Sequence, residues 1–104
     1  MNTQPYQYQT PPKIERAQEC LDRGLVLAMF GDRESAVRLY RKALLLDPNN
    51  ALGHYMLGKM LMDQGQELDA LDEWREATLT NRVDGSAVWA KRECEELINR
   101  YQGD

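Results

Sequence analysis

Two stretches of the sequence decide the fold because they match each other: GLVLAMFGDRESAVRLYRKALL at residues 24–45 and GKMLMDQGQELDALDEWREATL at residues 58–79. An offset of 34 residues places glycine on glycine, alanine on alanine and one large aromatic residue on another. The paired positions are Gly24 and Gly58, Leu27 and Leu61, Gly31 and Gly65, Ala36 and Ala70, Tyr40 and Trp74, Arg41 and Arg75, Ala43 and Ala77, and Leu45 and Leu79. A repeat of this length predicts a solenoid of stacked helix pairs.

Turn residues divide the repeat region and its flanks into helical segments. The interruptions are Gly31-Asp32, Asp47-Pro48-Asn49-Asn50, Gln64-Gly65 and Asp84-Gly85. The stretches between them are rich in Leu, Ala, Glu, Arg and Met and lack runs of β-branched residues. They predict five helices, at residues 13–30, 33–46, 50–64, 67–81 and 85–101. We expect Asp84 or Ser86 to cap the last of them.

The repeated residues resemble the tetratricopeptide repeat (TPR) family. In that family a glycine on the first helix lets the second helix approach closely, an aromatic residue and two alanines fit against it, and a proline closes the unit. The first unit carries Gly24, Leu27, Ala36, Tyr40, Ala43 and Pro48, and the second carries Leu57, Gly58, Leu61, Ala70, Trp74 and Ala77. The resemblance implies an all-α, right-handed α-solenoid of antiparallel helix pairs, with repeats at residues 17–50 and 51–84 and a capping helix at residues 85–101.

Four positions depart from the family's pattern. Cys20 and His54 stand where the family usually has a large aromatic residue, Arg23 stands where it has an aliphatic one, and Arg82 stands where it has proline. The arginine at position 23 is consistent with a first unit that has no neighbour on one side. The missing proline at position 82 leaves the register of the last helix loosely specified.

Composition excludes several classes of protein. The chain has 104 residues, of which 42% are hydrophobic and 29% charged, and this predicts one soluble domain. The net charge of −4 argues against nucleic-acid partners, which need a surplus of Lys and Arg. The longest apolar run, residues 24–30, is too short to cross a membrane. The N-terminus resembles no secretory signal, so we expect a cytoplasmic protein.

Residues 1–12 differ from the rest of the chain. They hold three of the four prolines and no charged side chain. Because proline interrupts helices and the apolar content is low, this stretch predicts a flexible tail ahead of a single TPR-like domain at residues 13–104.

No residue constellation in the sequence is typical of catalysis or of metal binding. It has no serine–histidine–acid set, no glycine-rich phosphate loop and no zinc motif, and Cys20 and Cys94 lie far apart. We therefore expect no enzyme, no cofactor and no metal site, and the only histidine, His54, falls at a packing position of the repeat. Four acidic side chains share one helix face: Asp69, Asp72, Glu73 and Glu76. A solvated face is the main interpretation, and a divalent metal or a basic partner is the alternative.

The resemblance places the candidate binding site on the concave side of the array, where the first helix of each unit lines a groove for a partner peptide. The corresponding residues are Leu21, Leu25 and Met29 in the first unit, Leu52, Tyr55, Lys59 and Met62 in the second, and Trp89 in the last helix. Leucine, methionine, tyrosine and tryptophan side chains favour an apolar or amphipathic segment, and methionine adapts to imperfectly matched partners.

Two functions remain open. The first is a non-enzymatic adaptor or scaffold that binds a protein or peptide partner in the groove, with no nucleic acid and no membrane insertion. The alternative is a self-assembling module that forms a homo-oligomer through its repeat ends, because two units are fewer than the three usually needed for stability.

Overall fold

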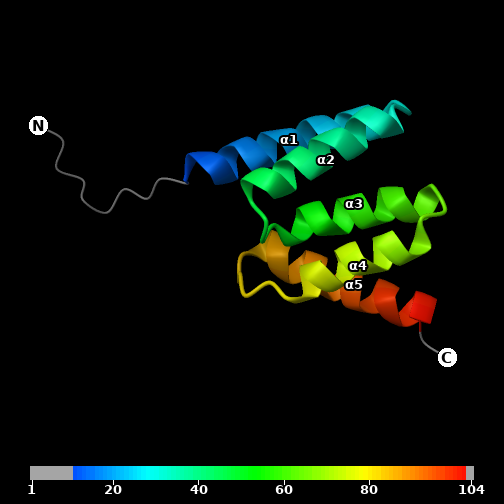
Figure 1. Cartoon of the computed structure of the whole chain (residues 1–104). Coiled ribbons are helices and arrows are strands. Elements are labelled where there is room, and N and C mark those ends of the chain that lie inside the picture. The colour runs from blue at the N-terminus through cyan, green and yellow to red at the C-terminus, as the bar shows by residue number, and fades with distance from the viewer. Residues whose placement is uncertain (1–10, 103–104) are drawn as a thin grey trace, which may run out of the picture.

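The computed structural model describes residues 11–102, which form five helices and the turns that connect them (Figure 1). They are α1 (Pro12–Met29), α2 (Arg33–Leu46), α3 (Ala51–Asp63), α4 (Glu67–Thr78) and α5 (Gly85–Gln102). Helix α1 packs along α2 and α3 along α4, while α2 contacts α3, and α5 lies against both α3 and α4. The predicted all-α array of consecutive helix pairs is confirmed. Most of the predicted tail, residues 1–10, lies outside the described residues.

Gly31 and Gly65 end the first helix of each pair in the same way. Their φ angles are +90° and +80°, a region that favours glycine because a Cβ atom would be strained there. Each glycine and the residue after it donate backbone hydrogen bonds to carbonyl oxygens of the last helical turn, which is the Schellman arrangement. The repeat in the sequence is therefore also a repeat of turn geometry.

Side-chain caps begin three of the described helices. Oδ1 of Asp32, Asn50 and Asp84 accepts a hydrogen bond from the backbone N–H three residues later, at 3.1, 2.9 and 3.1 Å. Asp84 is one of the two caps predicted for α5. Helix α4 ends at Thr78 rather than at residue 81, because the N–H groups of Leu79 and Thr80 bond to carbonyl oxygens only three residues back and close the last turn.

Each helix pair crosses at a glycine. A Cβ atom at Gly24 would lie 2.5 Å from Cε1 of Tyr40, and one at Gly58 would lie 2.5 Å from Cδ1 of Trp74. Both rings are buried, and Nε1 of Trp74 donates to the carbonyl oxygen of Tyr55 at 3.2 Å. The missing side chain at each glycine therefore makes room for an aromatic ring of the second helix.

The buried side chains of the described residues form two clusters that join into one core. The first contains Tyr40 and Leu57 and lies among α1, α2 and α3, with a contribution from α4. The second contains Trp74 and Cys94 and lies among α3, α4 and α5. Leu52 packs against both clusters, so α3 connects the two halves of the core.

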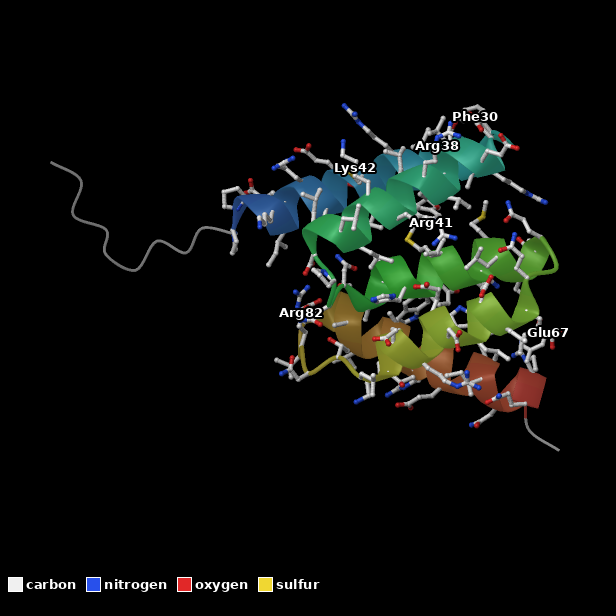
Figure 2. The ribbon with its side chains drawn as sticks, viewed as in Figure 1. Phe30, Arg38, Arg41, Lys42, Glu67 and Arg82 are labelled. Carbon is white, nitrogen blue, oxygen red and sulfur yellow. The ribbon has the colours of Figure 1, made fainter. Side chains whose placement is uncertain are left out.

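Arg82 fixes the connection before α5, where the family has a proline. Its guanidinium donates to both carboxylate oxygens of Asp47, with Nη1 2.7 Å from Oδ2. Figure 2 shows Arg82 in the α4–α5 connection, beside the turn that joins α2 to α3. The hydrogen bonds from Arg82 hold the pKa of Asp47 below its ordinary value of 3.8, although burial alone raises it. The ion pair ties the two connections together just before α5 begins.

Candidate protein-binding surface

Seven of the eight predicted groove residues reach the surface of the first helices α1, α3 and α5, and we call them the first-helix surface. They are Leu25, Met29, Leu52, Tyr55, Lys59, Met62 and Trp89. Those on α3 follow one another at spacings of three and four, which places them on one face of that helix. Lys59 is exposed, and the other three on α3 are half-buried.

Leu21, the eighth residue, is a correction to the prediction because its side chain lies in the core. It is 1% exposed, and a Cβ atom built on Gly53 of α3 would lie 3.4 Å from its Cδ2. Residues 21, 25 and 29 share a spacing of four, which suggested one groove-facing stripe. Since Gly53 lets α3 approach α1 at this level, Leu21 fills the space between the two helices and is not available to a partner.

Tyr55 and Trp89 form an aromatic pair between α3 and α5. Their ring centroids lie 5.1 Å apart with the planes at 77°, the edge-to-face arrangement that aromatic pairs prefer. Tyr55 packs against the second core cluster, whereas Trp89 remains 47% exposed. Burial and the nearby charge of Glu93 raise the pKa of the Tyr55 hydroxyl, so it stays neutral at physiological pH. The pair is a positioned aromatic anchor with one ring in contact with solvent.

The rest of the first-helix surface is apolar with one cation. Leu25 and Met29 lie one turn apart on α1 and are 47% and 75% exposed. Met62 of α3 is half-buried, and the ammonium group of Lys59 is on the same face of that helix. This set of side chains suits burial against apolar groups, with one place for a carboxylate or a carbonyl oxygen.

Two of the four acidic side chains on the α4 face, Asp72 and Glu73, have local partners. Asp72 accepts a hydrogen bond from Arg75 at 3.1 Å, and Glu73 contacts His54. Within residues 11–102, no group of three or more His, Cys, Asp or Glu side chains is arranged to hold a metal ion. The divalent-metal alternative therefore has no ligand set in this part of the molecule.

Both cysteine thiols are free and buried. Burial raises the pKa of Cys94 to about 12, so the thiolate form that reacts with disulfides or metals is scarce at neutral pH. Among the described helices, none has the length and apolar character that crossing a membrane requires.

His54 joins α3 to its neighbours by two hydrogen bonds. Nδ1 lies 2.8 Å from Oε1 of Glu73 on α4, and Nε2 lies 2.8 Å from the carbonyl oxygen of Pro48. Both partners are acceptors, so both are satisfied only by the doubly protonated imidazolium. Burial alone lowers the pKa of His54, but these hydrogen bonds and the charges of Glu73 and Glu76 raise it above the ordinary value of 6.5.

We expect the two hydrogen bonds of His54 to make the stability of the domain depend on pH. Because the pKa of His54 is raised in the folded state, His54 contributes fully to the free energy of unfolding below about pH 6.5, its pKa in the unfolded chain. This contribution is lost as the pH rises through the folded-state pKa. Because His54 is the only histidine, proton NMR titration reads its pKa directly. Glu73→Gln should lower that pKa, and Asp72→Asn, which removes the same charge one residue away, should change it little. A wild-type pKa at or below 6.5 would contradict the stabilising role.

One exposed apolar feature, at the C-terminal end of α1, was not predicted from the sequence. Val26 and Phe30 are 51% and 85% exposed and lie on a different side of the helix from Leu25 and Met29. The sequence does carry a signal for it. Residues 24–30 are apolar on every side of the helix, whereas a helix with one buried face needs apolar residues on that face only.

The TPR repeat family model matches residues 24–65, from the middle of α1 through α3 to the turn that follows it. The comparisons with curated proteins and with solved structures found no match. The matched segment includes the crossing of Gly24 with Tyr40 and both turn glycines, Gly31 and Gly65. A TPR repeat is typical of a protein–protein interaction module without catalytic activity. The chain therefore carries a tetratricopeptide repeat, at residues 24–65, within an all-α array of helix pairs.

Proposed function

We propose that the first-helix surface binds an apolar or amphipathic peptide segment of a protein partner, so that the chain works as an adaptor or scaffold. The observation that carries this proposal is the Tyr55–Trp89 pair, in which a tryptophan supported by a second ring keeps 47% of its surface exposed. Burying that surface against an apolar partner is favourable by roughly 25 cal/mol for each Å². Tryptophan and tyrosine are also among the residues that most often dominate binding energy.

The partner in this proposal is an extended or helical segment that runs across several helices. The exposed apolar side chains come from α1, α3 and α5, so a ligand that covers Leu25, Met29 and Trp89 together crosses the array. Methionine side chains are flexible and polarizable, and they adapt to partners of differing shape. Lys59 favours a segment that carries an acidic residue or ends in a free carboxylate beside its apolar residues.

Selection of a displayed random-peptide library against the purified protein tests the proposal. Enriched peptides should be apolar or amphipathic, and their binding should change the tryptophan fluorescence. Because Trp74 is fully buried, a change in emission reports mainly on Trp89. We expect Trp89→Ala to lower the affinity for the enriched peptides at least about tenfold, as is usual for a central aromatic contact.

Val88→Ala is the matched control. Val88 is the neighbour of Trp89 in α5 and has the same exposed fraction, 47%, but its side chain points about 100° away around the helix. We expect this variant to bind the peptides as the wild type does, with both variants keeping helical circular dichroism. Equal affinity of Trp89→Ala and wild type, or an equal loss in Val88→Ala, would exclude the first-helix surface as the binding site.

A further inference from the structure

The two ends of the helix array present different chemistry to solvent. At the C-terminal end, the outer side of α5 carries Lys91, Arg92 and Glu95 around a partly exposed Val88. This charged outer face is what a terminal helix of a repeat array needs in water. At the other end, no helix of the described residues covers the outer side of α1.

The outer side of α1 is apolar. Val26 lies five residues after Leu21, which faces α3, so its side chain points about 140° away from that neighbour. Phe30 lies one turn further along the same side, and Figure 2 shows it at the α1–α2 end of the molecule. Val26 lines a shallow cavity of about 530 Å³, together with Asp22, Arg23 and Leu27 of α1 and Leu39 of α2. We define the N-terminal face as Asp22, Arg23, Val26, Leu27, Phe30 and Leu39.

We propose that the N-terminal face is the interface of a symmetric dimer, covered by the same face of a second copy of this chain. Val26 and Phe30 are 51% and 85% exposed, and Leu27 and Leu39 are half-buried between them and the core. Contiguous apolar surface that is exposed on a folded protein is often an interaction site. The charged outer side of α5 does not complement it, because stacking the two ends would bury Arg92 and Glu95 against apolar groups.

The charges at the rim of the N-terminal face favour a second copy over another occupant. Asp22 and Arg23 both border the cavity. Asp22 accepts a hydrogen bond from Gln18 at 3.0 Å, and no ion pair to Arg23 forms within residues 11–102. In an interface with two-fold symmetry, residue i contacts residue j and j contacts i, so a pairing of Arg23 with Asp22 across the interface would form twice and use both groups. A partner with one sign of charge would satisfy only one of the two groups.

The dimer and the proposed peptide binding use different surfaces, so neither depends on the other. Val26 follows Leu25 in α1 and therefore points about 100° away from it around the helix. Phe30 follows Met29 as the C-cap residue of α1. An interface of a face with itself also closes after two copies, whereas end-to-end stacking would continue into longer chains.

Light scattering coupled to size-exclusion chromatography measures the mass of the full chain at concentrations between about 1 μM and about 1 mM, a range that covers weak interfaces. We expect the wild type to approach twice the mass of one chain at the upper end. Val26→Glu should remain a single chain there, and Val88→Glu, a matched change of a valine of similar exposure on α5, should still form the dimer. Circular dichroism confirms folding, and Phe30→Glu replaces Val26→Glu if the latter unfolds.

Exchanging the charges of Asp22 and Arg23 distinguishes the symmetric interface from non-specific hydrophobic association. Arg23→Asp and Asp22→Arg should each weaken the dimer at least about threefold at low salt, and the double variant should regain affinity because the reciprocal pairs are restored with reversed sign. The proposal would be overturned if the wild type stays a single chain at about 1 mM or grows beyond two copies. It would also be overturned if Val88→Glu loses the dimer as fully as Val26→Glu does.

Discussion

Gly58→Ala should destabilise the domain by about 2–3 kcal/mol, although alanine is the better helix former. The new Cβ would lie 2.5 Å from Cδ1 of the Trp74 indole ring, closer than two such carbon atoms can approach, and Trp74 is fully buried. The ring is packed in the second core cluster, and a shift would also strain its hydrogen bond to the carbonyl oxygen of Tyr55. The expected result is a melting temperature lower by roughly 10–20 °C.

Gly85→Ala is the control for this substitution. Gly85 also lies in a helix, but no heavy atom outside its immediate neighbourhood comes within 4 Å of a Cβ built there. We expect its effect to stay within about 0.5 kcal/mol of zero. Urea or thermal unfolding followed by circular dichroism measures both variants. If Gly58→Ala melts at the wild-type temperature, α3 and α4 do not cross as closely as the structure shows.

The close crossings were predictable from the sequence because they depend on residue size at repeated positions. Gly24 and Gly58 recur at the same offset as the aromatic residues Tyr40 and Trp74 that fill the space above them. The turns after α1 and α3 were predictable for a similar reason, since only glycine readily adopts their positive φ angles. Such features depend on residues that are close in the sequence or that recur at the 34-residue repeat.

Features that depend on one long-range partner were not predictable. Leu21 has the spacing of a groove residue, and its burial follows from how closely α3 approaches at Gly53. Arg82 and Asp47 are 35 positions apart and belong to no repeat pairing, so no pattern indicates that they meet. The first-helix surface itself stays a prediction, because the positions of its side chains follow from the helix period while its ligand does not.

Arg82→Met should cost about 2–3 kcal/mol at neutral pH, because it leaves a buried carboxylate without its cation. The side chain of Asp47 is 4% exposed, and after the substitution Asn50, at 3.2 Å, is the side-chain donor that remains to it within residues 11–102. Methionine keeps much of the apolar stem of arginine, so the loss reports mainly on the charge and its hydrogen bonds. Arg75→Met is the matched control: its pair with Asp72 has side chains 45% and 72% exposed, and we expect less than about 0.5 kcal/mol.

The pH dependence of this difference identifies Asp47 as the cause. In the wild type the folded-state pKa of Asp47 is lowered, so Asp47 contributes fully to the free energy of unfolding above about pH 3.8. This contribution is lost as the pH falls through the folded-state pKa. In Arg82→Met, burial acts without the compensating arginine and raises that pKa, so protonation relieves the buried charge. The difference in unfolding free energy between wild type and Arg82→Met should therefore narrow from pH 7 to pH 3. At pH 7, the double variant Asp47→Asn/Arg82→Met should recover part of the stability that Arg82→Met loses. A gap that stays constant with pH, or a double variant no more stable than Arg82→Met, would show that Arg82 stabilises the array through packing of its stem rather than through the carboxylate.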